Sequence, residues 1–285
     1  MRAAGENGDV TRIVPASITC MFTPKREKDP KLSGSYGVGI ALRNGSKAVC
    51  RKSEREETVF LGCRNVRTVE LALSFLKARY STGKFRLELK PNYPIGCGFG
   101  MSASLTLSAL TVTAELFDLP LKDIADVADI AHEAEVVSST GLGDVVTQVH
   151  GGIVCRLEAV CPSLAKVKKV SLPLRSLDLL VLGELDTGEA LEEYDFSTGL
   201  KRMKEFLKNP TVEGLFYHSK AFALECGIMD EDVLDVIEAV EAAGGMASMV
   251  MLGKAVFAVN GFEAMREFGK PFRAEIDFEG LRFRA

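Results

Sequence analysis

The segment from Pro94 to Ser104 constrains the fold more than any other part of the chain, because it places three glycines between two segments of opposite pattern. Residues 85–90 (FRLELK) alternate apolar and charged side chains, which predicts a half-buried strand. Residues 103–117 are apolar on nearly every side, which predicts a buried helix. A glycine-rich turn from strand to helix can direct backbone N–H groups at an anion, and the helix dipole favours negative charge there. The segment is therefore either a phosphate-binding loop or a tight turn that binds no ligand.

The hydroxyl groups of this loop extend its possible chemistry. Ser102 and Ser104 are placed where they can reach phosphate oxygens or a bound Mg²⁺. The spacing differs from GxxxxGK[ST], since no Lys follows the last glycine, and it is not a well-formed GxGxxG. The candidate ATP- or phosphate-binding residues are Pro94, Gly96, Gly98, Gly100, Met101, Ser102, Ala103 and Ser104.

A second group of polar residues follows on a helix predicted over residues 121–137. Glu135 lies eleven residues beyond the apolar Ile124, about 20° from a whole number of helical turns, so it points with the buried face. Glu133 lies about 180° from Ile124 and should face water. A buried carboxylate needs a cation or a hydrogen-bond donor. For Glu135 that partner is either Mg²⁺, which one or two carboxylates usually hold together with phosphates, or a Lys or Arg side chain.

Four further polar residues occur where each has a functional and a structural interpretation. Asp144 follows the turn 141–143 and is either a functional acid or a helix N-cap. His132 either binds a ligand or is a core histidine bonded to the backbone. Arg156 interrupts the apolar run 153–157, where a permanent cation is out of place unless it meets a carboxylate or phosphate. Ser35 lies in a glycine-rich bend that is either part of a site or only a turn.

Composition and patterning define the fold class. The chain has 285 residues, 47% hydrophobic and 26% charged, which indicates a globular protein of one large or two modest domains. A soft boundary spans residues 157–176, where two prolines flank a basic run. Strands and helices interleave, which predicts an α+β fold in two layers. Beyond the boundary we expect strands at 177–183, 247–252 and 255–259 and helices near 190–208, 213–226 and 230–243.

Several classes of protein are disfavoured by the sequence. No run of about 18 apolar residues is long enough to span a membrane, and the first twelve residues are too polar for a secretory signal. The seven scattered cysteines contain no CxxC pair, which argues against a structural zinc site. A net charge of −4 without a dense basic block argues against a nucleic-acid partner. We therefore expect a soluble cytoplasmic protein that meets anions in a local pocket.

Three of these segments together resemble the GHMP kinase superfamily of small-molecule kinases. Residues 94–104 are similar to its central phosphate loop, residues 141–144 with Gly151 and Gly152 to its GxxD and GG element, and residues 244–257 to its carboxyl-terminal motif. The resemblance implies a two-domain GHMP kinase fold. Residues 1–165 would form an ATP-binding domain like domain 2 of ribosomal protein S5, residues 166–285 a ferredoxin-like domain, and ATP would bind between them.

Within that superfamily the chain resembles the archaeal pantoate kinase family in residues 15–19, 34–39, 131–145 and 249–259. The resemblance implies transfer of phosphate from ATP to (R)-pantoate, giving 4-phosphopantoate for coenzyme A biosynthesis. Asp144 would be the general base or orienter of the attacking hydroxyl, and Glu135 with Ser104 would hold Mg²⁺. Arg156 would bind the pantoate carboxylate, with His132 and Ser35 completing the acceptor site. ATP and pantoate are the expected partners, with neither nucleic acid nor membrane, and a homodimer is left open.

Two alternatives compete with this interpretation. One is a related kinase for another small hydroxy acid such as mevalonate or homoserine; homoserine would need a second, acidic contact for its ammonium. The other is a non-catalytic nucleotide- or RNA-binding protein with an S5-like fold. Glu135, Asp144 and the complete glycine loop argue against the second, since a silent binder has no need of a carboxylate beside an acceptor, and the negative net charge disfavours RNA.

Overall fold

The long strand β2 (Gly34–Lys52) organises the first sheet because both of its edges are paired. In the computed structural model, which describes residues 8–121 and 123–282, β1 (Val10–Lys25) runs antiparallel along one edge. The other edge is shared by β5 (Ile153–Arg156) at one end and β4 (Phe85–Pro91) at the other. Outside them, β3 (Glu57–Phe60) lies parallel to β4 and β6 (Val167–Val170) antiparallel to β5. β5 therefore pairs with residues 37–40, in the first half of β2.

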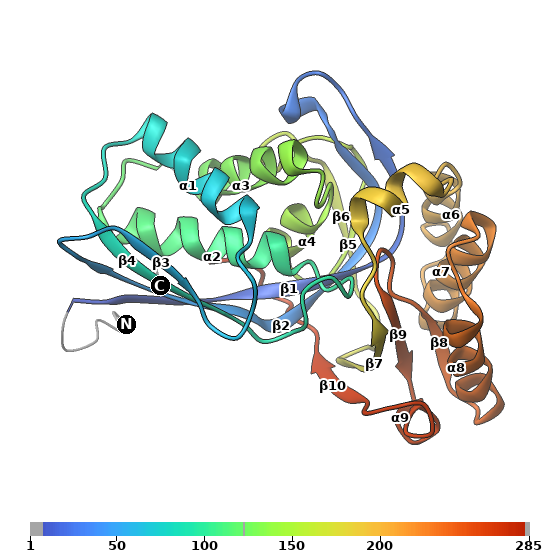
Figure 1. Ribbon diagram of the computed structural model, residues 1–285. Helices are drawn as coiled ribbons and strands as arrows, with labels where there is room; N and C mark the ends of the chain where they lie inside the picture. Colours follow the sequence, from blue (N-terminus) through green and yellow to red (C-terminus); the bar gives the residue numbers. More distant parts are fainter. Residues whose placement is uncertain (1–7, 122, 283–285) are drawn as a thin grey trace.

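Helices cover one face of this sheet (Figure 1). α2 (Met101–Leu116) packs directly on β1 and β2, with α1 (Arg67–Arg79) and α3 (Ile124–Ser138) on its outer side. Contact on both sides explains why α2 is apolar nearly all round. The half-buried strand predicted at 85–90 and the buried helix predicted at 103–117 are both confirmed, as β4 and α2.

α3 begins later than the helix predicted over 121–137. Its first residue is Ile124, because the Asp123 side chain caps the helix in a capping box with Asp126. Lys122 lies outside the described residues. The short helix α4 (Asp144–His150) follows and contacts β1, α2 and β5, while the 3₁₀ turn η1 (Pro30–Leu32) packs on α3.

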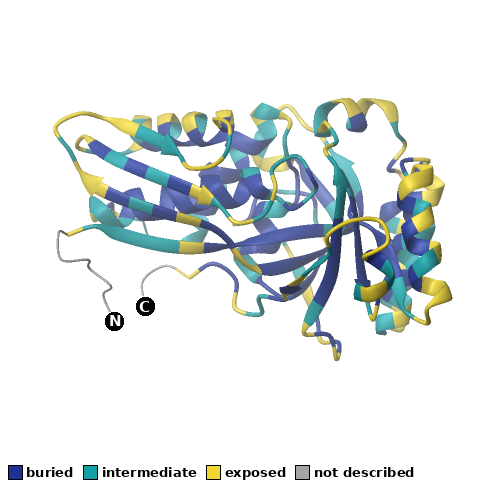
Figure 2. Cartoon of the chain, turned by 60° about the horizontal axis from the view of Figure 1, so that its bottom comes forward, coloured by how far each residue is buried: buried dark blue, intermediate teal, exposed yellow. Residues whose placement is uncertain are grey.

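A second, antiparallel sheet has the order β10-β7-β9-β8, with α7 and α8 packed on it (Figure 1). Figure 2 shows buried residues running through both sheets and exposed residues on the outer helix faces. The second sheet and the helices next to it consist of β7 (Ser176–Gly183), α7 (Val212–Cys226), α8 (Glu231–Ala242), β8 (Met246–Met249), β9 (Lys254–Val259), α9 (Phe262–Met265) and β10 (Phe272–Glu275). The strands and helices expected here are confirmed, except that the strand expected at 247–252 ends at Met249, before a turn, and that one predicted helix is divided.

That helix, expected near 190–208, is two helices, α5 (Thr187–Glu193) and α6 (Gly199–Phe206). Between them the chain turns inward to bury Phe196, whose ring stacks on that of Phe22 with 4.5 Å between the centroids. Phe222 of α7 meets the same two rings. Burial of these three aromatic rings fastens β1 of the first sheet to α7, which packs on the second sheet.

The two sheets divide between Val170 and Ser176 rather than at residue 165. β6 is hydrogen-bonded to β5 and so belongs to the first sheet. A boundary at residue 165 would separate β6 from β5. After β10 the chain returns to the first sheet, where Ile276 pairs with Leu42 of β2. None of the helices in the described ranges is both long and apolar enough to cross a membrane. The α+β class in two layers is confirmed.

Candidate active site

The glycine loop between β4 and α2 has a backbone that ordinary residues rarely adopt. Gly96 and Gly98 have φ of +82°, and Gly100 has φ of +57°. A Cβ on Gly100 would strike the Ser17 hydroxyl and lie 2.8 Å from Gln148 Nε2 and 3.0 Å from Asp144 Cγ. Glycine at this position lets the loop lie directly against those three side chains at the N-terminus of α2.

The loop forms one wall of a cavity of about 400 Å³. Other walls come from the C-terminal end of α3 with the turn after it, from the loop between β7 and α5, and from the turn between β8 and β9. The cavity therefore lies between the part of the chain that forms the first sheet and the part that forms the second. Its lining residues in the loop and α2 are Ile95, Gly96, Gly98, Phe99, Gly100, Met101 and Ser102, whereas the predicted Pro94, Ala103 and Ser104 do not line it.

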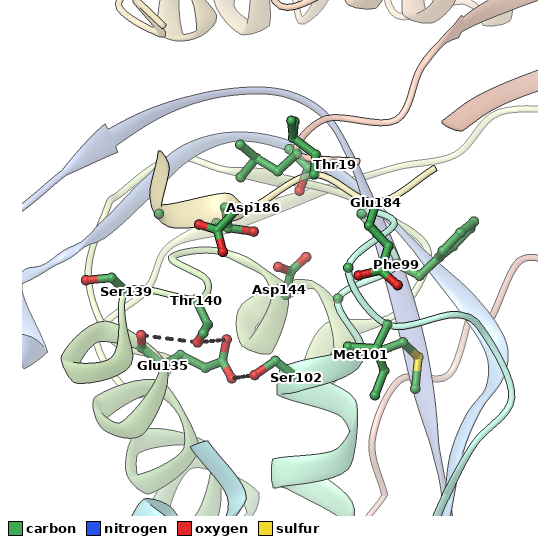
Figure 3. Close-up of a pocket in the computed structure, with 18 of the residues that line it drawn as sticks. Thr19, Phe99, Met101, Ser102, Glu135, Ser139, Thr140, Asp144, Glu184 and Asp186 are labelled. Carbon is green, nitrogen blue, oxygen red and sulfur yellow. Dashed lines mark hydrogen bonds between the residues drawn. The ribbon is translucent and has the colours of Figure 1, made fainter. Parts of the chain in front are cut away.

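Glu135 is buried at the floor of this cavity and is held by hydroxyl groups (Figure 3). Ser102 Oγ donates to Glu135 Oε1 at 2.5 Å, and Thr140 Oγ1 donates to Oε2 at 3.0 Å. Burial raises the pKa of Glu135 to about 7; repulsion by Asp144 adds to the rise, and the hydrogen bonds from Ser102 and Thr140 oppose it. The carboxylate is therefore poorly neutralised by the protein alone.

Glu133 occupies the opposite side of α3. Its Oε2 lies 2.5 Å from Nη2 of Arg79 in a partly exposed ion pair. The helical arithmetic that directed Glu135 inward and Glu133 outward is thereby confirmed, and only Glu135 lines the cavity.

Ser104 does not lie where the sequence analysis placed it. Its buried hydroxyl donates to Ser46 Oγ at 2.8 Å, on the sheet side of α2. Two residues along an α-helix turn the side chain by about 200°, so Ser102 and Ser104 cannot both face the cavity. The prediction that Ser104 assists Glu135 is corrected: the hydroxyl beside Glu135 belongs to Ser102.

Asp144 is the first residue of α4, and its side chain lies next to Gly100 of the glycine loop. The N-cap of α4 is Gly143, so Asp144 is not the cap. Its Oδ1 accepts a hydrogen bond of 2.9 Å from Ser17 Oγ. Burial raises the pKa of Asp144, while the Ser17 hydroxyl and the charge of Arg156 lower it. Asp144 lines both the large cavity and a small pocket beside it.

Arg156 is a fully buried cation that lines the small pocket, which has a volume of about 20 Å³. Its Nε donates to the Ser35 carbonyl at 3.1 Å and Nη1 donates to Thr147 Oγ1 at 2.9 Å. Nη2 is buried and has no hydrogen-bond partner among the described residues. A buried guanidinium nitrogen without a partner is unfavourable, so this pocket is suited to an anion. The pocket is lined by Thr19, Phe22, Ser35, Gly141, Leu142, Gly143, Asp144, Arg156, Thr187, Leu191 and Leu252.

Gly143 fixes the spacing between these polar groups. A Cβ there would lie 2.5 Å from Arg156 Cζ and 2.6 Å from Ser35 Oγ. The turn before α4 can therefore pass beside the guanidinium and the hydroxyl only because residue 143 has no side chain. The predicted proximity of Ser35, Asp144 and Arg156 is present in the structure.

His132 does not join them. Its Nε2 lies 2.9 Å from the Ser33 carbonyl and 3.2 Å from the Pro30 carbonyl, and it lines neither the cavity nor the pocket. Burial lowers its pKa, which favours the neutral ring. The prediction of a substrate contact is corrected: His132 is a core histidine that fastens η1 to α3, just before the strand that carries Ser35.

Several lining residues were not predicted from the sequence. Thr19 lies on β1 and lines both spaces, while Glu184 and Asp186 reach the cavity from the second sheet (Figure 3). Arg64 lines the cavity from the loop before α1 and lies 3.6 Å from Glu184. The segment 15–19 gave a signal for Thr19 through its family resemblance, but no local pattern marks residues 64, 184 or 186.

The donor set around Glu135 fits a magnesium ion. Mg²⁺ prefers oxygen ligands and is usually held by one or two carboxylates together with substrate phosphates. Glu135 offers a buried carboxylate and Ser102 a hydroxyl oxygen at the end of the glycine loop. The described residues contain no cluster of three or more His, Cys, Asp and Glu side chains that could hold a metal ion unaided.

Comparison with known proteins agrees with this geometry. The family model for the GHMP kinases N terminal domain matches residues 67–152, which include α1, β4, the glycine loop and α4. The chain is 28% identical over 265 residues to a pantoate kinase of Thermococcus kodakarensis, with 88% of this chain and 87% of that protein covered. It is 27% identical over 279 residues to a pantoate kinase of Methanospirillum hungatei, with 94% and 93% covered.

A solved structure described as a phosphotransferase related to the CoA biosynthesis pathway superposes on the chain with a TM-score of 0.84. The two are 25% identical, and the superposition covers 95% of this chain and 97% of the other. The sequence and fold matches each cover 88% or more of the chain. Residues 67–152 thus match the GHMP kinases N terminal domain, and the chain as a whole is similar in sequence to pantoate kinases and in fold to the CoA-related phosphotransferase.

Proposed function

We propose that this protein is a small-molecule kinase that transfers the γ-phosphoryl group of ATP to the 4-hydroxyl of (R)-pantoate, giving 4-phosphopantoate for coenzyme A biosynthesis. One observation carries the proposal: Asp144 stands in the shared wall of a cavity of about 400 Å³ beside the glycine loop and a small pocket that contains a buried, partly unpaired arginine. The relatives named pantoate kinase supply the identity of the acceptor.

On the donor side, the glycine loop and the first turn of α2 bind the phosphates of ATP. The backbone N–H groups at a helix N-terminus have no partners within the helix and attract anions. Gly96, Gly98 and Gly100 keep side chains away from these groups. This arrangement positions the γ-phosphoryl group, and positioning with charge neutralisation supplies most of the catalysis in phosphoryl transfer.

Glu135 and Ser102 are the residues that would hold Mg²⁺. When bound, the ion neutralises charge on the phosphate oxygens. The protein's own contribution is to keep the Glu135 carboxylate buried and oriented by Ser102 and Thr140. Asp186 and Glu184 lie on the other side of the same cavity (Figure 3).

On the acceptor side, Arg156 binds the substrate carboxylate through its free Nη2. Phe22, Leu142 and Leu191 give the same pocket an apolar lining for the methyl groups of pantoate, and its volume of about 20 Å³ requires the pocket to widen as the substrate enters. Asp144 then lies beside the acceptor hydroxyl, where it orients the oxygen and accepts its proton as the new P–O bond forms. Burial favours this role, since it raises the pKa of Asp144 and so its proton affinity.

Other functions fit the pocket less well. Homoserine carries an ammonium group, yet Asp144 is the only carboxylate among the described residues that line the pocket. A single carboxylate could not both orient the hydroxyl and pair with the ammonium. A non-catalytic RNA-binding role is disfavoured by the net charge of −4 and by the buried position of Glu135 and Asp144. Mevalonate, a hydroxy acid without an ammonium, remains the competing acceptor.

A panel of acceptors tests the assignment. The protein is incubated with ATP, Mg²⁺ and, separately, pantoate, mevalonate, homoserine and pantothenate, while ADP formation is followed. We expect turnover with pantoate at the highest kcat/KM, and a product whose phosphorus NMR signal is that of a phosphate monoester. Turnover of mevalonate or homoserine in preference to pantoate would contradict the proposal.

Removal of the Glu135 charge tests the magnesium site. We expect Glu135→Gln to raise the Mg²⁺ concentration for half-maximal rate by on the order of tenfold to a hundredfold, because a charged ligand is replaced by a neutral one. The measurement is the rate of ADP formation against free Mg²⁺ at saturating ATP and pantoate. Glu133→Gln is the matched control, since Glu133 is on the same helix but pairs with Arg79 at the surface. Equal Mg²⁺ dependence in both variants would remove Glu135 from the metal site.

We also place the protein in the cytoplasm. The reaction draws on ATP, and all seven cysteines are free. Free thiols in this number fit a reducing compartment.

A further inference from the structure

We propose that Ser17 and Gln148 are positioning residues that fix the Asp144 carboxylate, so that one of its oxygens is directed at the acceptor hydroxyl. The inference rests on the proposed function, in which Asp144 receives the hydroxyl proton. Neither residue lines the cavity or the acceptor pocket, so both act through Asp144.

Ser17 is held from two sides. It is fully buried on β1, and its backbone N–H donates to the Phe99 carbonyl of the glycine loop at 3.1 Å. Its hydroxyl donates to Asp144 Oδ1 at 2.9 Å. The strand, the phosphate-binding loop and the proposed base are therefore joined through one small side chain.

Gln148 determines the direction of the Ser17 hydroxyl. Its Nε2 donates to Ser17 Oγ at 2.9 Å and to the Gly100 carbonyl at 2.8 Å. A carbonyl oxygen only accepts hydrogen bonds, so the amide of Gln148 must present its nitrogen to Gly100 and, from the same atom, to Ser17. Because Ser17 Oγ accepts from Gln148, its own proton is directed to Asp144.

The opposite orientation of the amide is unfavourable. It would set the Gln148 oxygen against the Gly100 carbonyl oxygen and draw the Ser17 proton away from Asp144. In the observed orientation Gln148 Oε1 is buried and has no partner among the described residues. An apolar side chain would avoid that loss, so packing alone does not account for a glutamine here.

The consequence is a carboxylate with two different oxygens. Oδ1 is occupied by Ser17, whereas Oδ2 faces Gly141, whose added Cβ would lie 3.2 Å from Oδ2 and 2.7 Å from Oε2 of Glu135. Gly141 lines the acceptor pocket and Glu135 the larger cavity, so Oδ2 is directed at the boundary between the two spaces, where the acceptor hydroxyl would meet the phosphate. Gln148 follows Asp144 by one turn of α4, so the helix carries both the base and the residue that orients its support.

Ser17→Ala tests the inference in the intact protein. We expect kcat for pantoate phosphorylation to fall by roughly 10- to 100-fold, because a hydrogen bond to a charged group is lost. The KM values for ATP and pantoate should change by less than about twofold, since Ser17 lines neither the cavity nor the acceptor pocket and its backbone hydrogen bond to Phe99 is kept in the variant. Ser17→Cys keeps a weak donor and should restore part of the lost kcat.

Gln148→Glu tests the direction of the hydroxyl at nearly constant side-chain shape. Its carboxylate would attract the Ser17 proton away from Asp144, so kcat should fall about as far as in Ser17→Ala. The double variant should be little worse than Ser17→Ala alone, because the two residues act in series on one group. Ser219→Ala is the control, since it removes another buried serine hydroxyl whose hydrogen bond goes to the Leu215 carbonyl on α7.

Thermal unfolding of every variant shows whether the fold is kept. Wild-type kcat in folded Ser17→Ala, or fully additive losses in the double variant, would overturn the inference while leaving the proposed function intact. A wild-type protein that phosphorylates no hydroxy acid would overturn the proposed function, and this inference with it.

Discussion

Asp144→Asn is expected to lower kcat for pantoate by roughly 10²- to 10⁴-fold, the range over which a positioned acid or base usually contributes. Asparagine has the same shape and can still accept the Ser17 hydrogen bond at one oxygen, but it cannot take the hydroxyl proton. The measurement is steady-state kinetics at saturating ATP and pantoate.

Stability should not fall with this substitution. Asp144 is buried and burial disfavours its charge, so a neutral side chain there removes an unfavourable desolvation term. Thermal unfolding separates the two effects, and binding of ATP measured by calorimetry should stay close to that of the wild type. A folded Asp144→Asn variant with wild-type kcat would show that Asp144 does no more than begin α4.

Arg156→Ala is expected to raise the KM for pantoate by roughly 10- to 150-fold, equivalent to about 1.5–3 kcal/mol for a lost charged hydrogen bond. The KM for ATP should change little, because Arg156 lines the acceptor pocket and not the larger cavity. Initial rates against each substrate at saturating concentrations of the other measure the two constants separately.

Arg156→Lys is the companion variant. It keeps the charge but loses the planar group that reaches Ser35, Thr147 and the substrate together, so only part of the binding should return. Both variants need a thermal unfolding control, since Arg156 is fully buried and bonded to the backbone. An equal rise in the KM for ATP would assign Arg156 to the phosphate site instead.

The local parts of this site were predictable because each depends on a short-range rule. A strand, a glycine-rich turn and an apolar helix in succession identify the loop at 94–104 wherever it lies in the fold. The 3.6-residue period was enough to direct Glu135 inward and Glu133 outward on α3. Arg156 was identifiable because a cation inside an apolar strand requires an anion.

The predictions for individual side chains were wrong where the role of a residue depends on what its side of the helix packs against. α2 is covered on both sides, so its apolar pattern does not indicate which serine meets the cavity; Ser102 does and Ser104 meets the sheet. His132 is one turn before Glu135 on the same helix, but that turn lies against η1 rather than the cavity. Glu184 and Asp186 reach the site because the loop after β7 lies against the glycine loop, and Arg64 reaches it from the loop before α1; no local pattern encodes either contact.

The final described segment, from Ile276 to Leu281, bears on when the site can form during synthesis. Leu281 N–H donates to the Gln148 carbonyl at 2.9 Å, and Gly152 N–H donates to the Asp277 carbonyl at 2.5 Å, so this segment braces α4 and the turn after it. A ribosome that has reached Leu252 has already made every residue lining the cavity and the pocket. The helix that carries Asp144 still lacks these two hydrogen bonds at that point, so we expect the site to reach its full geometry only after the last strand and the segment after it have emerged and folded back.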